Sequence, residues 1–419
     1  MEKLVLINIA ELVVVRGFAA KKGKEMSQID KINNAYLEIE GERISSFGQQ
    51  KDYVKKPDAK VIDCAGKTVL PGFIDSHSHF VFGGYRADEF NWRLQGQKYM
   101  EIMNKGGGIA ATTTATKSAS KKELIHGALG RLKLALSQGV TTMEGKSGYG
   151  LDLDTEIKQL EVMKELNDIQ DIDVVSTFMG AHATPKGEEP KEYIKFICDE
   201  VLPVVAKRRL AEFCDVFCEP NVFDIEMAKQ VLLKAKKLGL KTKIHADEIV
   251  SIGGSEMAAE INSSSADHLL QIPDGAIRKL AESNTIATLL PLTAFCLKEN
   301  YAPARKLIDN GCAVALASDL NPGSCHCQNI SLLIAISAIY MNMTIEEIVT
   351  ALTINAAAAI GREKTIGSID IGKVADIIIL EWPSINYLPY HTASNSVVTV
   401  IKNGKIVFEQ PEGFKCGMK

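Results

Sequence analysis

The chain has 419 residues, of which 46% are hydrophobic and 24% are charged, and its formal net charge is -4 at pH 7. Such a composition is typical of a globular protein long enough for one large domain and a smaller one. The mild negative charge gives no reason to expect nucleic acid or a membrane surface as a partner. No apolar run is long enough to cross a bilayer. Nine cysteines scattered along the chain favour a reducing cytoplasm over a disulfide framework.

Short alternating segments separated by turn residues occupy the two ends of the chain. The apolar segment 4–15 has polar interruptions and no small-residue cleavage site after it, so it predicts a strand rather than a signal peptide. Near the other end, Asn403-Gly404 between two apolar runs predicts a hairpin turn. We therefore predict one small β-sandwich domain formed by both chain ends, residues 1–66 together with 362–419.

Between these ends, over residues 67–361, apolar strand-like runs alternate with amphipathic stretches. Apolar residues at helical spacing predict helices over 155–170 and 225–238. Eight strand–helix alternations predict an α/β fold, a (β/α)8 TIM-like barrel. The candidate strands end near His79, Gly145, His182, Glu219, His245, His268, Pro291 and Asp319. A doubly wound sheet is the alternative, but the first strand lacks the glycine-rich turn of a dinucleotide fold.

Two histidines, His77 and His79, stand two residues apart at the end of the apolar stretch that predicts the first strand of the barrel. Side chains alternate between the faces of a strand, so both imidazoles point the same way and can share one metal ion. Three more histidines, His182, His245 and His268, fall at predicted strand ends, where the catalytic groups of such barrels lie. This pattern predicts a metal site at that end of the barrel.

Longer motifs, spread over most of the chain, carry a resemblance to a known family. They are His-X-His within 77–86, the run 94–109, Glu-Gly-Lys-Ser-Gly-Tyr-Gly-Leu-Asp over 144–152, Gly-Ala-His-Ala over 180–183, His-Ala-Asp-Glu over 245–248, Ser-Ala-Asp-His-Leu over 265–269 and Ser-Asp-Leu-Asn-Pro-Gly-Ser over 318–324. On these residues the chain resembles the amidohydrolase superfamily of metal-dependent hydrolases. Within it, the runs 144–152 and 318–324 are similar to those of enzymes that open the ring of 4-imidazolone-5-propanoate.

The resemblance implies a hydrolase of carbon–nitrogen bonds in cyclic amides, which forms N-formimidoyl-L-glutamate in the third step of histidine degradation. An amide resists water, so a metal ion is expected to lower the pKa of a bound water to roughly neutral. One Zn²⁺ or iron ion (Fe²⁺ or Fe³⁺) per chain is expected, since both accept imidazoles and a carboxylate. The predicted ligands are His77, His79, His245 and Asp319.

Four residues are predicted to take part in the chemistry. Asp319 is suited both to touch the metal and to take the proton of the water. His268 is predicted to polarise the carbonyl or to shuttle a proton, and His182 to hold the substrate ring or its oxygen. By resemblance, Glu248 binds the nitrogen side of the ring, where a carboxylate accepts hydrogen bonds.

The propionate of the substrate, the small-molecule partner that we expect, requires a cation. Arg86 presents a planar fork that fits a carboxylate, and Tyr149 can add a hydroxyl. By resemblance, Asn321, Gly323 and Ser324 also contact the substrate or product. The resemblance further implies association of two chains as a homodimer, although no motif carries this.

Three residues depart from the family pattern: Ala110, Leu292 (where Thr is expected) and Leu320 (where Phe is usual). None of them removes a predicted ligand, so they affect the expected shape of the pocket rather than the chemistry.

Structural roles compete with several of these assignments. His182 or His268 can be a core histidine satisfied by the backbone, and Asp319 can cap the helix after the last strand. Glu144 and Glu219 can be buried partners of lysines rather than site residues. Cys325-His326-Cys327 suggests a second metal clip, but a closed zinc site needs four ligands and no second pair lies nearby in the sequence. We therefore do not predict metal there.

Two other functions remain open at this stage. A two-metal amidohydrolase of the dihydroorotase or deaminase kind would recruit His268 and His182 as ligands around a bridging carboxylate. A non-enzymatic scaffold of the same fold would lack metal ligands, and the full ligand set argues against it.

Overall fold

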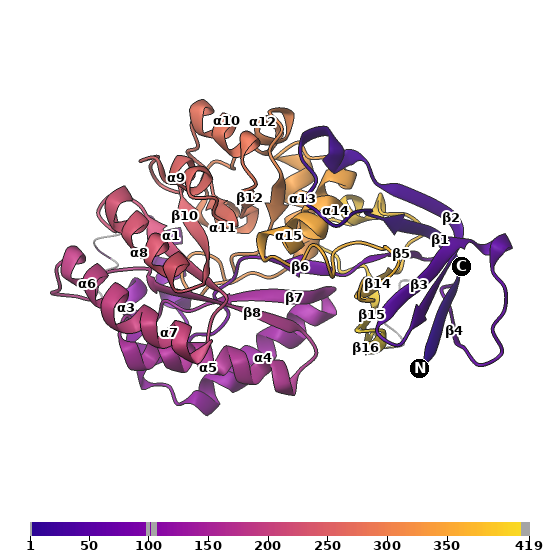
Figure 1. Cartoon of the computed structure of the whole chain (residues 1–419), viewed down its shortest axis with the longest axis horizontal. Coiled ribbons are helices and arrows are strands. Elements are labelled where there is room, and N and C mark those ends of the chain that lie inside the picture. Colours follow the sequence, from indigo (N-terminus) through magenta and orange to yellow (C-terminus); the bar gives the residue numbers. More distant parts are fainter. Residues whose placement is uncertain (1, 98–100, 102–106, 412–419) are drawn as a thin grey trace.

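The computed structural model describes residues 2–97, 101 and 107–411. Part of the motif 94–109 therefore lies outside the described residues. Two eight-stranded sheets build the protein (Figure 1): a parallel barrel ringed by helices, and a second sheet made from the two ends of the chain. The predicted fold class is confirmed.

The barrel strands follow one another around the sheet in chain order. They are β6 (Phe73–Asp75), β7 (Val140–Lys146), β8 (Asp173–Ala181), β9 (Phe213–Cys218), β10 (Lys241–Ala246), β11 (Ser265–His268), β12 (Ile286–Leu289) and β13 (Val314–Leu316). Neighbouring strands are parallel, so their carboxyl ends meet at one mouth. The ring closes beyond β6 and β13, where Ser78 pairs with Leu320 and the N–H of His79 donates to the Leu320 carbonyl at 2.8 Å.

Helices cover the outside of the barrel and its mouth. They are α1 (Ala87–Leu94), α3 (Ile109–Ser118), α4 (Lys121–Ser137), α5 (Leu153–Ile169), α6 (Pro190–Phe196), α7 (Leu202–Arg208), α8 (Ile225–Lys237), α9 (Gly254–Glu260), α10 (Asp274–Glu282), α11 (Pro291–Leu297), α12 (Ala304–Asp309), α13 (Ile330–Ile339), α14 (Ile345–Leu352), α15 (Ile354–Ala359) and α16 (Tyr387–Tyr390). Short 3-10 turns cover Gly23–Ser27 and Gln50–Asp52, and one π turn covers Ile197–Val201.

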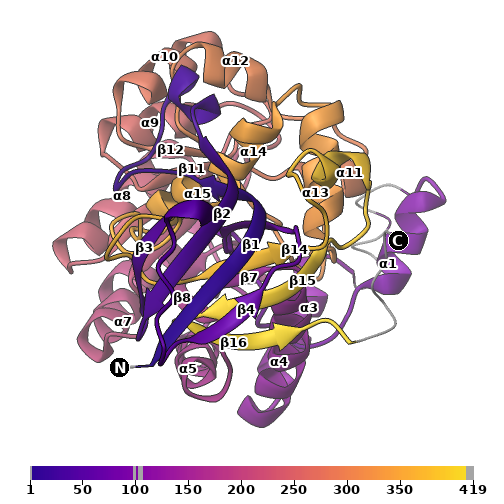
Figure 2. The same cartoon turned by 90° about the vertical axis from the view of Figure 1, so that its right-hand side faces the viewer.

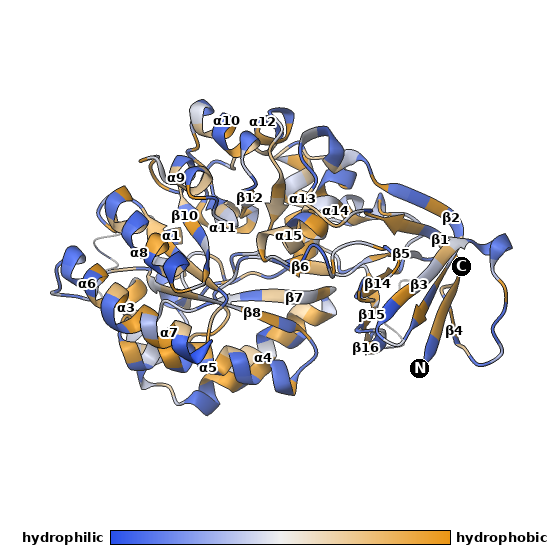
Figure 3. Cartoon of the chain, viewed as in Figure 1, coloured by the Kyte–Doolittle hydropathy of each residue, from blue (hydrophilic) through white to orange (hydrophobic). Residues whose placement is uncertain are grey.

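The two helices predicted from periodicity, over 155–170 and 225–238, are α5 and α8. Each begins where an aspartate caps it: Asp152 accepts from the N–H of Thr155, and Asp224 accepts in the same way before α8. Figure 3 shows blue and orange stretches along α5 and α8, as expected of helices with one polar and one apolar face. The apolar face packs into the main core between helices and strands.

The second sheet joins strands from both chain ends in the order β16-β15-β14-β5-β1-β2-β3, with β4 beside β1. Its strands are β1 (Lys3–Val14), β2 (Asp30–Glu40), β3 (Arg43–Gln49), β4 (Lys60–Asp63), β5 (Thr68–Pro71), β14 (Ile377–Leu380), β15 (Val397–Lys402) and β16 (Lys405–Glu409). The predicted hairpin at Asn403-Gly404 joins β15 to β16, with both residues at positive φ.

The chain-end sheet folds over an apolar core of its own. Figure 2 shows β1 to β3 crossing β14 and β15, and side chains from both groups form one buried cluster that includes Ile9, Leu37, Ile377 and Ile401. The predicted domain boundary at residue 67 lies just before β5, and β5 pairs with β1 and β14 in this sheet.

Two further properties concern the described residues only. No helix among them combines the length and apolar character needed to cross a membrane. The eight cysteines that lie in this part of the chain are all free.

Candidate active site

A cavity of about 580 Å³ opens at the carboxyl ends of the barrel strands. All but one of the predicted site residues line it: His79, Arg86, Tyr149, His182, His245, Glu248, His268, Asp319, Asn321, Gly323 and Ser324. The exception, His77, is fully buried against this wall. Residues from distant parts of the sequence are therefore brought to one place, as the strand-end pattern predicts.

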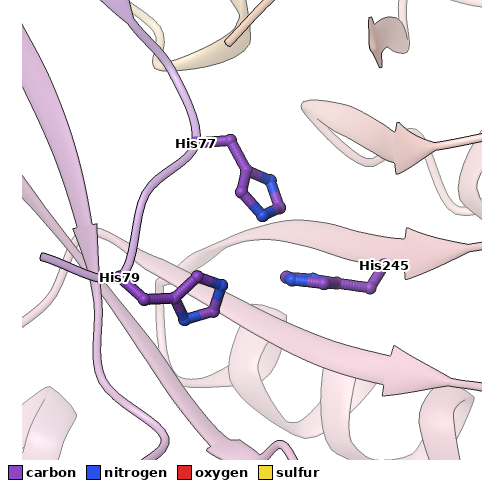
Figure 4. A group of neighbouring side chains, drawn as sticks. All are labelled: His77, His79 and His245. Carbon is purple, nitrogen blue, oxygen red and sulfur yellow. The ribbon is translucent and has the colours of Figure 1, made fainter. Parts of the chain in front are cut away.

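Three histidines, two of which line this cavity, lie close to one another (Figure 4). His77, His79 and His245 each offer one ring nitrogen, and these nitrogens lie within 4.8 Å of one another. The prediction that the first two lie within a strand is wrong, because β6 ends at Asp75. Beyond it the backbone pairs across the closure of the barrel with Asp319 and Leu320 instead. This extended pairing still brings the two imidazoles to the same site.

Asp319 stands beside the three histidines. Its Oδ1 lies 3.5 Å from Nε2 of His77 and 3.8 Å from Nε2 of His79. Its Oδ2 accepts a hydrogen bond of 2.6 Å from the Thr293 hydroxyl. Burial raises the pKa of Asp319 to about 6. The next helix, α13, is capped by Asn329, so the alternative of a capping role for Asp319 is wrong.

Carboxylates lie behind two of the histidines. Nδ1 of His77 lies 2.7 Å from Oδ2 of Asp267, which leaves Nε2 of His77 buried without a hydrogen-bond partner among the described residues. Nδ1 of His245 lies 3.1 Å from Oδ2 of Asp215. A carboxylate that accepts from one ring nitrogen leaves the other nitrogen deprotonated and able to bind a metal.

A layer of buried charges lies directly beneath these carboxylates. Lys146 Nζ is 2.6 Å from Asp215 and 3.0 Å from Glu144, and Lys243 Nζ is 2.7 Å from Glu144. Both ammonium groups lie 3.7 Å from Asp267, and all five side chains are fully buried. Glu144 is thus a partner of buried lysines, which was one of its two predicted readings. Burial lowers the pKa of Lys146, but Asp215 and Glu144 outweigh it and raise this pKa.

Sequence reasoning missed four members of this layer, although a signal was present. Glu144 and Lys146 are two apart on β7, and Lys243 and His245 are two apart on β10. Residues two apart share a strand face, so each charged residue points into the barrel with its neighbour. This pattern marks Lys243, beside His245, and Lys146, beside Glu144, whereas Asp215 and Asp267 carry no such signal.

His268 and Glu248 form the next part of the wall. Nε2 of His268 lies 3.5 Å from Oε2 of Glu248, and neither ring nitrogen of His268 has a hydrogen-bond partner among the described residues. The alternative of a core histidine satisfied by the backbone is therefore wrong for His268. Burial lowers its pKa well below the usual value. Burial also raises the pKa of Glu248 to about 8, helped by the carboxylates of Asp319 and Glu219.

Glu219 supports this wall from behind. It accepts hydrogen bonds from the backbone N–H groups of Glu248, Ile249 and Val250, at 2.8, 2.9 and 3.1 Å. The reading of Glu219 as a lysine partner is wrong, because the donors are successive amides of the turn after β10. Glu219 therefore fixes the loop that presents Glu248.

His182 and Tyr149 close the side of the cavity next to His79. The ring of His182 stacks on that of His79, with centroids 5.2 Å apart, and Tyr149 lies 5.3 Å from His182. Nδ1 of His182 lies 3.1 Å from the Gly148 carbonyl. A carbonyl only accepts, so Nδ1 carries the proton and Nε2 of a neutral His182 is an acceptor. Burial lowers the pKa of His182 to about 3 and raises that of Tyr149.

Arg86 reaches the cavity from the residue before α1. Its Nε donates to Glu89 at 2.8 Å, and its Nη2 donates to the other oxygen of the same carboxylate. The guanidinium lies against Gly323, where a Cβ would stand 2.2 Å from Nη1 of Arg86. A side chain at this position would displace the guanidinium of Arg86 from its present place.

Asn321 organises the loop after β13 with its own side chain. Its Oδ1 accepts from the N–H groups of Gly323 and Ser324 at 2.9 and 2.8 Å, and its Nδ2 donates to the Asp319 carbonyl at 2.8 Å. The Ser324 hydroxyl lies 2.8 Å from Nδ2 of Asn321. The polar atoms of Asn321 are therefore engaged in holding the shape of this loop.

A family model described as the amidohydrolase family matches residues 68–407. The imidazolonepropionase of Clostridium tetani is 53% identical over 412 residues, which cover 97% of this chain and 98% of that protein. The imidazolonepropionase of Porphyromonas gingivalis is 52% identical over 412 residues, with 97% of both chains covered. The chain belongs to the amidohydrolase family, among the imidazolonepropionases.

Solved amidohydrolase structures share the fold at low identity. A triazine hydrolase from Arthrobacter aurescens superposes with a TM-score of 0.72 at 14% identity, over 98% of this chain and 96% of that chain. An adenosine deaminase from Xanthomonas campestris, described with bound zinc, gives 0.70 at 16% identity, over 97% and 93%. At such identities the likeness shows the shared barrel fold alone.

Membership of the amidohydrolase family implies a divalent metal, and the described residues fit one. The unpartnered, buried Nε2 of His77 and the convergence of three imidazole nitrogens are what a metal site requires. Such an arrangement without an ion would leave a polar atom buried at a cost of about 1–3 kcal/mol. The tripeptide Cys325-His326-Cys327 contributes to no such group within the described part of the chain.

The three departures from the amidohydrolase pattern lie away from the cavity wall. Leu292 and Leu320 are buried in the main core, and Ala110 is exposed on α3. None of the three belongs to the described residues that line the cavity. Thr293, next to Leu292, supplies the hydroxyl that holds Asp319.

Proposed function

We propose that the chain is an imidazolonepropionase, which hydrolyses the ring amide of 4-imidazolone-5-propanoate to N-formimidoyl-L-glutamate. Identity of 53% and 52% to proteins of that name, over almost the full length of each, carries this assignment. The reaction adds the hydroxyl of water to the carbonyl carbon, breaks the carbon–nitrogen bond and places a proton on the departing nitrogen. The site must therefore bind the ring, activate water and move that proton.

His77, His79, His245 and Asp319 are the proposed ligands of the metal. A divalent ion, zinc or iron, lowers the pKa of its bound water toward neutrality when it is present. Oδ2 of Asp319 accepts from Thr293, and this hydrogen bond orients the carboxylate so that Oδ1 faces His77 and His79. Asp319 is proposed to accept a proton from the water, because its carboxylate stands beside the three imidazoles.

Three side chains on the wall are proposed to hold the ring and to move the proton. His182 has its Nδ1 proton held by Gly148, so its Nε2 is free to accept from a ring N–H. Neither ring nitrogen of His268 has a hydrogen-bond partner in the described part of the chain, and we assign this group to polarising the carbonyl or to carrying the proton to the departing nitrogen. Glu248 stands within 3.5 Å of His268 and is proposed to bind the nitrogen side of the ring.

The propionate is proposed to lie toward Arg86. Glu89 engages Nε and Nη2 of this guanidinium and so fixes its plane, which favours carboxylate binding in a defined direction. Tyr149 and the loop of Asn321, Gly323 and Ser324 complete the proposed substrate contacts.

Purified protein reconstituted with Zn²⁺ or Fe²⁺ should consume 4-imidazolone-5-propanoate, followed by the loss of its ultraviolet absorbance, and should leave dihydroorotate unchanged. One tightly held ion per chain is expected by metal analysis. Two tightly held ions, or turnover of dihydroorotate alone, would favour the two-metal rival. No ring opening in metal-loaded protein would contradict the proposal. The homodimer and the cytoplasmic location stay predictions, which sizing chromatography and cell fractionation would test.

A further inference from the structure

The cation expected to bind the propionate is already paired in this structure. Arg86 donates through Nε and Nη2 to the carboxylate of Glu89, and the two side chains are 15% and 8% exposed. Glu89 also accepts from the N–H of Gly108 at 2.7 Å, which fixes it at the start of α3. Arg86 and Glu89 together carry no net charge, so the pair alone offers an anion good geometry but little electrostatic attraction.

A second arginine, Arg93, lines the same cavity about two helical turns further on, near the end of α1. Its Nη2 donates to the Gly323 carbonyl at 2.6 Å, and its Nε is buried with no hydrogen-bond partner among the described residues. No carboxylate of a described residue forms an ion pair with it. Glu299, also on the wall, is exposed and makes no ion pair with Arg93.

Both guanidinium groups meet at one glycine. Arg86 packs against the Cα of Gly323 and Arg93 binds its carbonyl, so Gly323 lies between the two cations at the loop after β13. The three charges influence one another: burial lowers the pKa of Arg93, Glu89 raises it and Arg86 lowers it. Two guanidinium groups and one carboxylate give the cluster of Arg86, Glu89 and Arg93 a single net positive charge.

We propose that Arg93 supplies the uncompensated positive charge that selects substrates with one carboxylate on the ring's side chain, while Arg86, held by Glu89, supplies direction. Arg93 is thus a specificity-determining residue, and the inference rests on the proposed function for the identity of the ring. A monoanionic tail of two or three carbons fits this charge count. A neutral tail leaves the positive charge of the cluster unbalanced, and a dianionic tail brings one negative charge too many.

The test measures binding of two ring probes to the metal-loaded enzyme by calorimetry. Imidazole-4-propionate carries the tail carboxylate, and 4-ethylimidazole lacks it. Arg93→Gln should weaken binding of imidazole-4-propionate by about 10- to 100-fold, the range for a hydrogen bond to a charged group, and leave 4-ethylimidazole within about twofold. Arg93→Lys, which keeps the charge but loses the fork, should fall between.

Arg362→Gln is the matched control, because Arg362 forms a partly exposed ion pair with Glu212 away from the cavity. This variant should leave the affinity for both probes unchanged. Equal loss of both probes in Arg93→Gln would assign Arg93 to loop structure and overturn the proposal, as would unchanged binding of both. If the wild-type enzyme discriminates between the probes through Arg93 but opens no imidazolone ring, the proposed function fails while the tail selectivity stands.

Discussion

The interior of the barrel near its mouth and the core of the chain-end sheet are both enclosed, yet they are built from opposite kinds of residue. The chain-end core is aliphatic, with Ile9, Leu37 and Ile377 at its centre. The barrel interior below the site instead holds fully buried charges, among them Lys146 and Lys243. Barrels of this class ordinarily fill that space with Val, Ile and Leu.

The difference separates stability from chemistry. A buried ion pair gains little net free energy, because the cost of removing two charges from water offsets their attraction. The layer beneath the histidines therefore serves to fix carboxylates behind the proposed ligands rather than to hold the fold together. Stability comes from the aliphatic packing between strands and helices and within the chain-end sheet.

The largest effect is expected from removing a proposed metal ligand. Asp319→Ala should lower turnover by about 10³-fold or more, because the ion and its water lose a ligand and the proton loses its acceptor. The urea midpoint of the metal-free protein should stay near that of the wild type. His126→Ala, on the exposed face of α4, is the control and should retain turnover. Normal turnover of Asp319→Ala would remove Asp319 from the site.

The converse change targets the chain-end core. Ile9 is fully buried there, so Ile9→Ala should lower the free energy of unfolding by about 2–5 kcal/mol through lost contacts and a residual cavity. Its kcat and KM should match the wild type at temperatures where it is folded. Ile371→Ala, at a side chain that is 66% exposed, is the control for urea denaturation. A large fall in kcat of folded Ile9→Ala would contradict the view that the chain-end core contributes to stability and not to catalysis.

The smallest effect sharpens the role of the buried charges. Asp267→Asn keeps the size of the side chain but removes the charge behind Nδ1 of His77. Metal affinity, measured by competition with a chelator, should fall by about 10- to 100-fold. Asp309→Asn, on an exposed residue, should leave affinity unchanged. Affinity of Asp267→Asn equal to that of the wild type would mean that the layer does not tune the ligands.

Much of the fold and the positions of the histidines could be predicted from local patterns. Apolar runs ending in His182, His245 and His268 mark parallel strands, and the carboxyl ends of parallel strands share one mouth. The residue at which β6 ends could not be predicted in this way. The residues after Asp75 remain extended because they pair with Asp319 and Leu320, a contact between distant segments that no local pattern contains.

The supporting partners were harder to predict than the residues they support. Glu219 binds three amides of a loop, and amide orientation depends on the turn after β10 rather than on residue type. The pairing of Arg86 with Glu89, three residues on, is compatible with a short helix that begins there. Gly323 is explained only by the arginine that packs against it. Such roles follow from close approach in space.

The proposed metal site lies where the barrel closes, between the segments that follow β6 and β13. The segments that follow the first and last barrel strands lie more than half the sequence apart and pair with each other: the N–H of Asp319 donates to the His77 carbonyl, and the N–H of His79 donates to the Leu320 carbonyl. An ion bound to His77, His79 and Asp319 would hold the two segments together, so occupancy of the metal site would favour the closed barrel by mass action. During synthesis this contact can form only after β13 and Asp319 have left the ribosome. A shorter chain can therefore neither close the barrel nor assemble the proposed metal site.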